Sequence, residues 1–209
     1  MNLEKNHWVK MLRRVATHLH ENKLYLSEID SRFGDGDHGV TMNKIADVIE
    51  STCDLWLKND WTIAEFFVEL GDRITNISGG SAGPLYGTFF SGLALEEETP
   101  TVCDASYLKR MLRHGLEELQ TITNAKVGDK TMMDALIPAV DAATSSPDDI
   151  RIVLHNARDA AIEGAKASEH FISRFGRAKS YKEATIGTPD AGAVSCSYIF
   201  IGLYEGLLS

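Results

Sequence analysis

The stretch DASYLKRMLRHGLEELQ, residues 104–120, repeats apolar side chains every three or four positions. The apolar members are Tyr107, Leu108, Met111, Leu112, Leu116 and Leu119. Because an α-helix has about 3.6 residues per turn, this spacing puts them on one side of an amphipathic helix, with charged residues around them. The stretch predicts a helix that buries one face in a helical domain.

The same period recurs on both sides of this stretch. Near the N-terminus the apolar stripe consists of Trp8, Met11, Leu12, Val15 and Leu19. The segment TIAEFFVEL, residues 62–70, opens with Thr62 and has Glu65 three positions later, a pair that predicts a capping box at a helix start. In SSPDDIRIVL, residues 145–154, Ser146 is expected to cap a helix whose first position is Pro147.

Alternation of apolar and polar residues, the mark of a half-buried strand, is not sustained anywhere in the chain. The segment SYIFIGL, residues 197–203, fits a buried strand or a buried helix, and its helical context favours the helix. We therefore expect an all-α fold of about seven or eight helices. With 209 residues, we expect a single domain over 1–209.

Composition narrows the possible partners. The formal net charge is -9 and no run of basic residues occurs, which argues against nucleic acid and anionic membranes as partners. The N-terminus lacks an uninterrupted apolar region, and no later segment is expected to reach the roughly 18 apolar residues of a spanning helix. We expect a cytoplasmic protein. The cysteines, Cys53, Cys103 and Cys196, are distant and odd in number, which predicts free thiols.

Glycine gathers in four segments between the expected helices, namely FGDGDHG (33–39), SGGSAG (78–83), VGDKT (127–131) and IGTPDAG (186–192). Glycine permits positive φ and a close approach of ligand to backbone amides. Four such loops in one small domain indicate a shared ligand, although each could also serve only to turn the chain.

Asp30, Asp35 and Asp37 have a spacing that one loop can fold into a convergent set. Three carboxylates brought together would repel one another unless a hard cation with oxygen ligands lies between them, which favours Mg²⁺. An EF-hand needs glutamate at its twelfth position, where this chain has Thr41 or Ala46, and His38 alone cannot form a zinc site. The alternative is that these acids cap and turn the chain. The segment HGVTMNKI, residues 38–45, predicts a helix start suited to a phosphate.

Four motifs in order, GDGDHG (34–39), SGGSAGPLYGTFF (78–90), VGDKTMMDALIP (127–138) and GRAKSYKEATIGTPDAGA (176–193), resemble the L subunit of dihydroxyacetone kinase, the nucleotide-binding DhaL family. The resemblance implies a barrel-like bundle of about eight antiparallel helices with a nucleotide and magnesium site at one end. It implies that two Mg²⁺ ions are held by Asp30, Asp35 and Asp37. The implied nucleotide contacts are His38, Gly39, Thr41, Gly80, Ser81, Ala82, Met132, Arg177, Asp190 and Gly192.

The resemblance further implies a kinase subunit that binds ADP or ATP and passes the γ-phosphoryl group to dihydroxyacetone. The acceptor would be held on a separate K-type subunit, so no catalytic residue beyond the metal and nucleotide site is expected here. Bound ADP would be recharged by a phosphocarrier protein of the phosphotransferase system. Two alternatives stay open: an ATP-exchanging subunit acting on a ketose such as erythrulose, and a nucleotide-sensing regulator of a transcription factor.

The chain also departs from the family pattern. The final loop has Thr188 where histidine is more frequent in the family and Ala191 where proline is, which bears on how the site closes over a nucleotide. Within the third motif, Asp129, Lys130 and Asp134 are expected to face solvent or to cap the following helix.

Overall fold

The computed structural model describes residues 2–95 and 102–209, which form helices and connections, apart from one antiparallel bridge between Leu3 and Cys103. The α-helices are α1 Lys5–Glu21, α2 Lys23–Ser31, α3 His38–Lys58, α4 Ile63–Thr75, α5 Ala82–Ser91, α6 Ala105–Ile122, α7 Met133–Ser145, α8 Ile150–Ala167 and α9 Ala191–Leu208. Two 3₁₀ segments, η1 Ser168–His170 and η2 Arg177–Thr185, lie between α8 and α9. The predicted all-α fold is confirmed.

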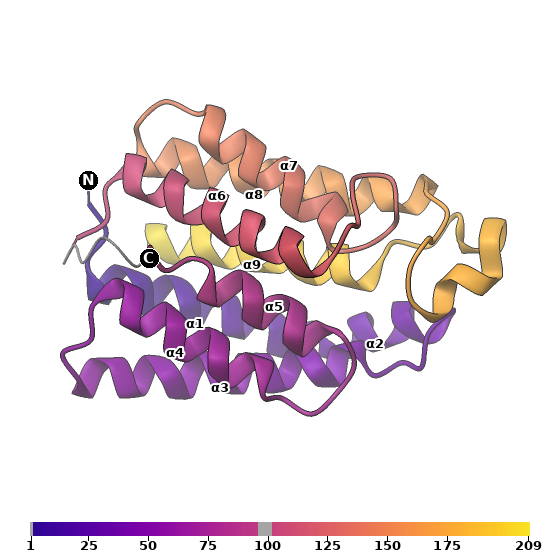
Figure 1. Ribbon diagram of the computed structural model, residues 1–209, viewed down its shortest axis with the longest axis horizontal. Coiled ribbons are helices and arrows are strands. Elements are labelled where there is room, and N and C mark those ends of the chain that lie inside the picture. The colour runs from indigo at the N-terminus through magenta and orange to yellow at the C-terminus, as the bar shows by residue number, and fades with distance from the viewer. Residues whose placement is uncertain (1, 96–101) are drawn as a thin grey trace.

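Eight of the helices close into a ring. From α3 to α9 each helix packs against the next in the chain, and α1 packs against both α3 and α9. The ninth helix, α2, is separated from α1 by Asn22 and lies against α3 at one end of the bundle (Figure 1). The predicted number of seven or eight helices is therefore slightly below the nine α-helices of the described residues.

Local sequence explains where several helices begin. The predicted stripe of α6 is buried, and Asp104 caps the helix by accepting a hydrogen bond from the backbone N–H of Tyr107 at 2.7 Å. The predicted capping box of α4 is confirmed: Thr62 Oγ1 accepts from the Glu65 N–H at 3.1 Å, and Glu65 Oε2 accepts from the Thr62 N–H at 2.8 Å. These bonds satisfy amides that lack partners within the helix.

The predicted start of α8 is wrong by three residues. Asp149, not Ser146, is the cap, and its Oδ1 accepts from the N–H groups of Arg151 and Ile152 at 2.8 and 3.2 Å. Ser146 instead ends α7, where its hydroxyl donates to the Ala142 carbonyl at 2.7 Å. The polar residues between the two helices are thus divided, with Ser146 at the end of α7 and Asp149 at the start of α8.

The helical interpretation of residues 197–203 is confirmed, because they lie within α9. The expectation that no segment reaches membrane-spanning length is wrong for this helix. By length and composition α9 is long and apolar enough, with a mean hydropathy of 1.4 over Ala191–Leu208. However, 67% of that segment is buried in the fold, where α9 packs against α1, α7 and α8. It is the apolar core helix of the bundle. The three cysteines are free and buried, as predicted.

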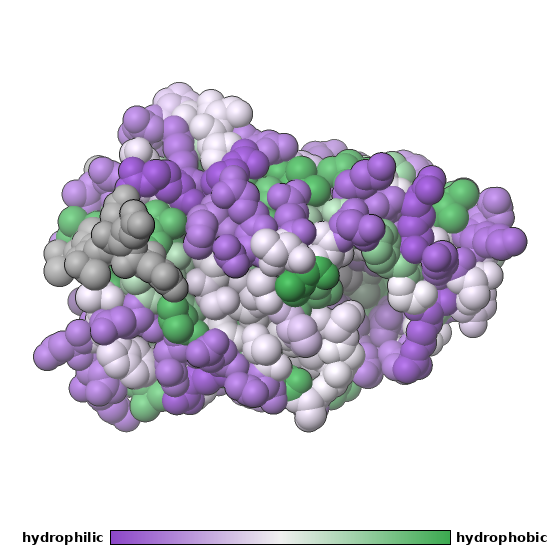
Figure 2. All heavy atoms as spheres, in the orientation of Figure 1, coloured by the Kyte–Doolittle hydropathy of each residue, from purple (hydrophilic) through white to green (hydrophobic). Residues whose placement is uncertain are grey.

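The two ends of the bundle differ. Both chain termini lie at one end, whereas α2, η2 and the starts of α3, α5 and α9 gather at the other (Figure 1). Hydrophilic residues cover most of the face seen in Figure 2, which is hollowed toward the end that carries η2. The glycine-rich segments belong to this second end.

Candidate functional site

A cavity of about 540 Å³ opens at the end of the bundle where the glycine-rich segments meet. This is within the usual range of small-ligand pockets. The first residues of four helices line it: His38 of α3, Ala82 of α5, Met133 of α7 and Ala191 of α9. Helix N-termini carry unpaired N–H groups and a partial positive charge, so their convergence favours an anionic ligand.

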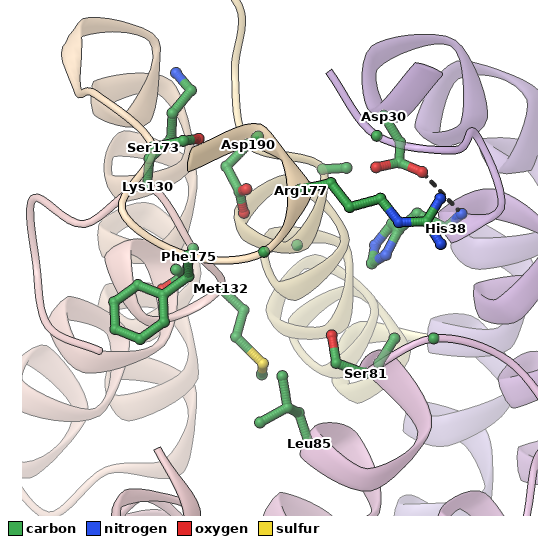
Figure 3. A pocket seen from close by; sticks show the side chains of 18 of the residues that line it. Asp30, His38, Ser81, Leu85, Lys130, Met132, Ser173, Phe175, Arg177 and Asp190 are labelled. Atoms are coloured by element: carbon green, nitrogen blue, oxygen red, sulfur yellow. Dashed lines mark hydrogen bonds between the residues drawn. The ribbon is translucent and has the colours of Figure 1, made fainter. Parts of the chain in front are cut away.

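The three aspartates of the first motif converge at this cavity. Asp30 lies in the last turn of α2, and Asp35 and Asp37 follow in the loop to α3. One carboxylate oxygen from each lies within 4.8 Å of the others. Gly36, with a φ of 75°, allows the turn that brings them together. The Asp30 carboxylate also accepts a hydrogen bond from the backbone N–H of His38 at 3.3 Å, which ties the end of α2 to the start of α3 (Figure 3). We call residues 30–37, which carry the three aspartates, the acidic loop.

The charges of this cluster are only partly balanced. Burial, together with repulsion from Asp35 and Asp30, raises the pKa of Asp37, and Arg177 opposes this shift. Arg177 extends from η2 toward the cluster (Figure 3) and forms an ion pair with Asp35 at 2.7 Å. Because the donors are all carboxylate oxygens, the set fits a hard divalent cation such as Mg²⁺.

His38 takes part in a hydrogen-bonded chain that joins three segments. Its Nε2 lies 2.9 Å from Ser195 Oγ of α9, which lies 2.8 Å from the Tyr86 hydroxyl of α5. The Tyr86 hydroxyl also donates to the Gly192 carbonyl at 3.1 Å. Burial lowers the pKa of His38 to about 4, so the imidazole is neutral near pH 7. Sequence reasoning missed Ser195 and Tyr86, whose only signal is a hydroxyl within an apolar helical pattern.

The opposite wall of the cavity is apolar. Met132 and Leu85 point into the space between α5 and the third motif, and Phe175 lies beside Met132 (Figure 3). Met132 is buried, as its type suggests, yet it lines the cavity as the resemblance implies. One side of the cavity therefore suits an apolar ring and the other suits a metal-bound anion, which together describe a nucleotide.

Twelve of the thirteen predicted site residues line this cavity. They are Asp30, Asp35, Asp37, His38, Thr41, Gly80, Ser81, Ala82, Met132, Arg177, Asp190 and Gly192. Gly39 does not line it. A Cβ at Gly39 would lie 1.9 Å from the Lys23 carbonyl oxygen, so this glycine permits the close contact between α2 and α3. It contributes to the site by fixing the acidic loop between those helices.

The final loop shapes the start of α9. Asp190 Oδ1 accepts from the Ala193 N–H at 2.8 Å and so caps the helix. Burial raises the pKa of Asp190 to about 7, with a smaller contribution from the Asp134 carboxylate. Thr188 is buried in the same loop and lines the cavity.

The expectation that Asp129, Lys130 and Asp134 face solvent is wrong, because all three are buried. The capping alternative does not hold either, because the start of α7 has no side-chain cap and the amides that the two acids bind all precede the helix. The Asp134 carboxylate accepts from the N–H groups of Gly128 and Thr131, both at 2.6 Å, and Asp129 accepts from the Lys126 N–H at 3.0 Å. These bonds shape the loop that carries Met132.

Comparison with known proteins agrees with this geometry. Residues 32–205 match the family described as the DAK2 domain. The chain belongs to the DAK2 domain family. It is 32% identical over 200 residues to the PTS-dependent dihydroxyacetone kinase, ADP-binding subunit DhaL, of Lactococcus lactis, covering 94% of this chain and 95% of that one. It is 30% identical over 203 residues to the PEP-dependent dihydroxyacetone kinase, ADP-binding subunit DhaL, of Escherichia coli, covering 95% of both.

A related protein of known structure has the same fold as this chain. The dihydroxyacetone kinase from C. freundii in complex with AMP-PNP and Mg²⁺ superposes with a TM-score of 0.70 at 28% identity. The match covers 94% of this chain and 33% of that longer one. The resemblance to the dihydroxyacetone kinase L subunit, inferred from four motifs, is thereby confirmed.

Proposed function

We propose that this chain is the nucleotide-binding subunit of a small-ketose kinase, acting as one domain in the cytoplasm. It holds ADP or ATP and passes the γ-phosphoryl group to dihydroxyacetone bound on a separate K-type subunit. The observation that carries the proposal is the convergence of Asp30, Asp35 and Asp37 beside a cavity lined by four helix N-termini. Relatives of nearly the same length are named as ADP-binding subunits of dihydroxyacetone kinase, which supports the same function.

Each wall of the cavity has a separate task in this proposal. The apolar wall formed by Met132, Leu85 and Phe175 holds the base, and the N-termini of α3, α5 and α9 receive the phosphates. Arg177, whose side chain is 71% exposed, is free to move from Asp35 to a phosphate oxygen. The neutral His38 orients the start of α3 through its contact with Ser195.

In this proposal Asp30, Asp35 and Asp37 would hold two Mg²⁺ ions, as their convergent carboxylate oxygens suit a hard divalent cation. When bound, such ions would cancel negative charge on the phosphates, and phosphoryl transfer depends mainly on this neutralisation and on positioning. The chain's own residues align the nucleotide, and the K-type subunit supplies the ketose and receives its hydroxyl proton.

We further propose that ADP stays bound and is rephosphorylated in place by a phosphocarrier protein that draws on phosphoenolpyruvate. The two bacterial relatives described above are named PTS-dependent and PEP-dependent, which supports this route over exchange of ATP.

Reconstitution tests the proposal. The purified chain is mixed with the K-type subunit of the same organism and dihydroxyacetone, and with either ATP or phosphoenolpyruvate plus phosphocarrier proteins. Dihydroxyacetone phosphate formed only in the second mixture supports recharging in place, whereas product with ATP alone supports the exchanging alternative. Absence of phosphorylated product in both mixtures, with erythrulose as well as dihydroxyacetone, would overturn the assignment as a ketose kinase subunit.

A further inference from the structure

Lys130 stands out within the third motif because three of its properties are unusual together. The residue is only 5% exposed. Its backbone has a φ of 59°, a conformation that residues other than glycine, asparagine and aspartate seldom adopt. Burial also lowers the pKa of its amino group. A lysine is retained in so unfavourable a place only where its contacts compensate.

Those contacts join two segments distant in sequence. The amino group donates to the Ser168 carbonyl at 2.6 Å and to the Thr188 carbonyl at 2.5 Å. Ser168 follows the last residue of α8, where the helix leaves carbonyl groups unpaired and carries a partial negative charge that a lysine complements. Thr188 belongs to the final loop, which leads into α9.

Two further hydrogen bonds join the final loop, residues 186–190, to the C-terminal end of α8 and the η1 segment that follows it. The Asp190 N–H donates to Ser168 Oγ at 2.9 Å, and the Gly187 N–H donates to the Glu169 carbonyl at 2.7 Å. Lys130 therefore completes a junction of the third motif, the end of α8 and the final loop. Two walls of the cavity meet at this junction, one bearing Met132 and the other Asp190.

The direction of the side chain separates this role from ligand binding. Figure 3 shows the amino group of Lys130 pointing away from the middle of the cavity, whereas Met132 points into it. Lys130 is among the residues that line the cavity, but its amino group is bound to the Ser168 and Thr188 carbonyls and is turned from the middle, so we assign it to the shape of the cavity.

We propose that Lys130 is a positioning residue that locks the final loop onto the third motif and thereby slows release of the nucleotide. The inference rests on the proposed nucleotide site. Loss of the amino group leaves the Thr188 carbonyl without this donor, so the loop from Gly187 to Asp190 opens more often and the bound nucleotide escapes faster.

The test compares two Lys130 variants with a matched control. Lys130→Met keeps the aliphatic stem, and Lys130→Gly removes the side chain while relieving the positive φ. The control is Lys5→Met, because Lys5 also donates to two backbone carbonyls, those of Trp56 and Asn59 at 3.0 and 2.8 Å. These carbonyls lie at the C-terminal end of α3, outside the cavity lining. If loss of such a lysine accelerated nucleotide release only by destabilising the fold, the Lys5 variant would show the same acceleration as the Lys130 variants.

Each protein is loaded with a fluorescent ADP analogue and Mg²⁺, and release is followed after addition of excess unlabelled ADP. Thermal unfolding of the nucleotide-free proteins is measured in parallel. We expect both Lys130 variants to release the analogue roughly tenfold faster than the unmodified chain, and the Lys5 variant to stay within about twofold. Should Lys130→Met fail to fold, Lys130→Gly carries the test.

Two results would overturn the inference. One is release from the Lys130 variants at the unmodified rate, and the other is an equal acceleration in the Lys5 variant, which would indicate general destabilisation. Failure of the unmodified chain to bind the analogue with Mg²⁺ would instead overturn the proposed nucleotide site itself. The two failures are therefore distinguishable.

Discussion

Replacing Asp37 by asparagine should have opposite effects on the stability of the ligand-free and the ligand-bound protein. Without a cation, the three carboxylates repel one another within 4.8 Å, and burial together with this repulsion raises the pKa of Asp37. Asp37→Asn removes one charge of the three and keeps a similar shape. The ligand-free variant should then be more stable than the unmodified protein.

The magnitude follows from Coulomb's law. Two unit charges about 4.8 Å apart repel by roughly 0.9 kcal/mol in water and by roughly 3.5 kcal/mol at an effective dielectric constant of about 20. The cluster is partly exposed and Arg177 offsets part of the repulsion, so we expect a net gain near the lower figure, about 1 kcal/mol. For a chain of this length that is an increase of about 2–4 °C in Tm.

With Mg²⁺ and ADP the order should reverse. A ligand at about 100 times its Kd adds roughly 2.7 kcal/mol to the stability of the unmodified protein, or about 5–10 °C in Tm. The variant lacks one of the three carboxylates and should gain little. The assay is thermal unfolding of both proteins after removal of nucleotide and metal by chelation, and again with saturating Mg²⁺ and ADP.

Asp72→Asn is the matched control, because Asp72 is an exposed aspartate of α4 that does not line the cavity. It makes the same change in net charge, so any general benefit of reducing the charge of -9 appears in both variants. If Asp37→Asn is no more stable than the control without ligand and gains as much Tm as the unmodified protein with ligand, the acidic loop is not a cation site.

Three further predictions follow from the site. Arg177→Met should weaken the affinity for ADP and Mg²⁺ by about tenfold or more through loss of a charged donor, and unchanged affinity in calorimetric titration would remove Arg177 from the site. Its ligand-free Tm should fall by no more than about 2–4 °C, because Arg177 offsets part of the carboxylate repulsion but its side chain is 71% exposed. Tyr86→Phe should cost about 1 kcal/mol and lower Tm by about 2–4 °C, since the hydroxyl contacts Ser195 and Gly192; an unaltered thermal melt would contradict this. The pKa of Asp190 is about 7 in the folded protein against an ordinary 3.8, so the folded state binds this proton more tightly than the unfolded chain does. This contribution to stability is complete below pH 3.8 and is lost as pH rises through about 7. Asp190→Asn keeps the helix cap and removes the titration, so its Tm relative to the unmodified protein should rise between about pH 5 and about pH 8, and a constant difference would refute the assignment.

The helices were predictable where one physical rule acts alone. Apolar periodicity located α1 and α6, and the Thr62 and Glu65 pair located the start of α4, because burial of one face and satisfaction of terminal amides are local requirements. The start of α8 was not predictable in this way. Ser146, Pro147 and Asp149 all suit a helix end, and only the packing of α7 decides that Ser146 belongs to the earlier helix.

The lining of the site was predictable from motif resemblance, whereas the residues that support it were not. The third motif's Lys130 binds carbonyls 38 and 58 residues away, and His38 meets Ser195 157 residues away. No local pattern carries such contacts, because they depend on how the ring of helices closes. Buried hydroxyl groups such as that of Tyr86 look in sequence like ordinary parts of an apolar stripe.

The central claim is that the cavity holds a nucleotide together with magnesium. The most direct test is to purify the protein without added nucleotide, denature it, identify released small molecules by chromatography, and measure magnesium on the same sample. The account predicts ADP and magnesium released in fixed proportion to protein, or an empty protein whose Tm rises only when ATP and Mg²⁺ are added together. A protein that releases no nucleotide and whose Tm responds to neither would contradict the account.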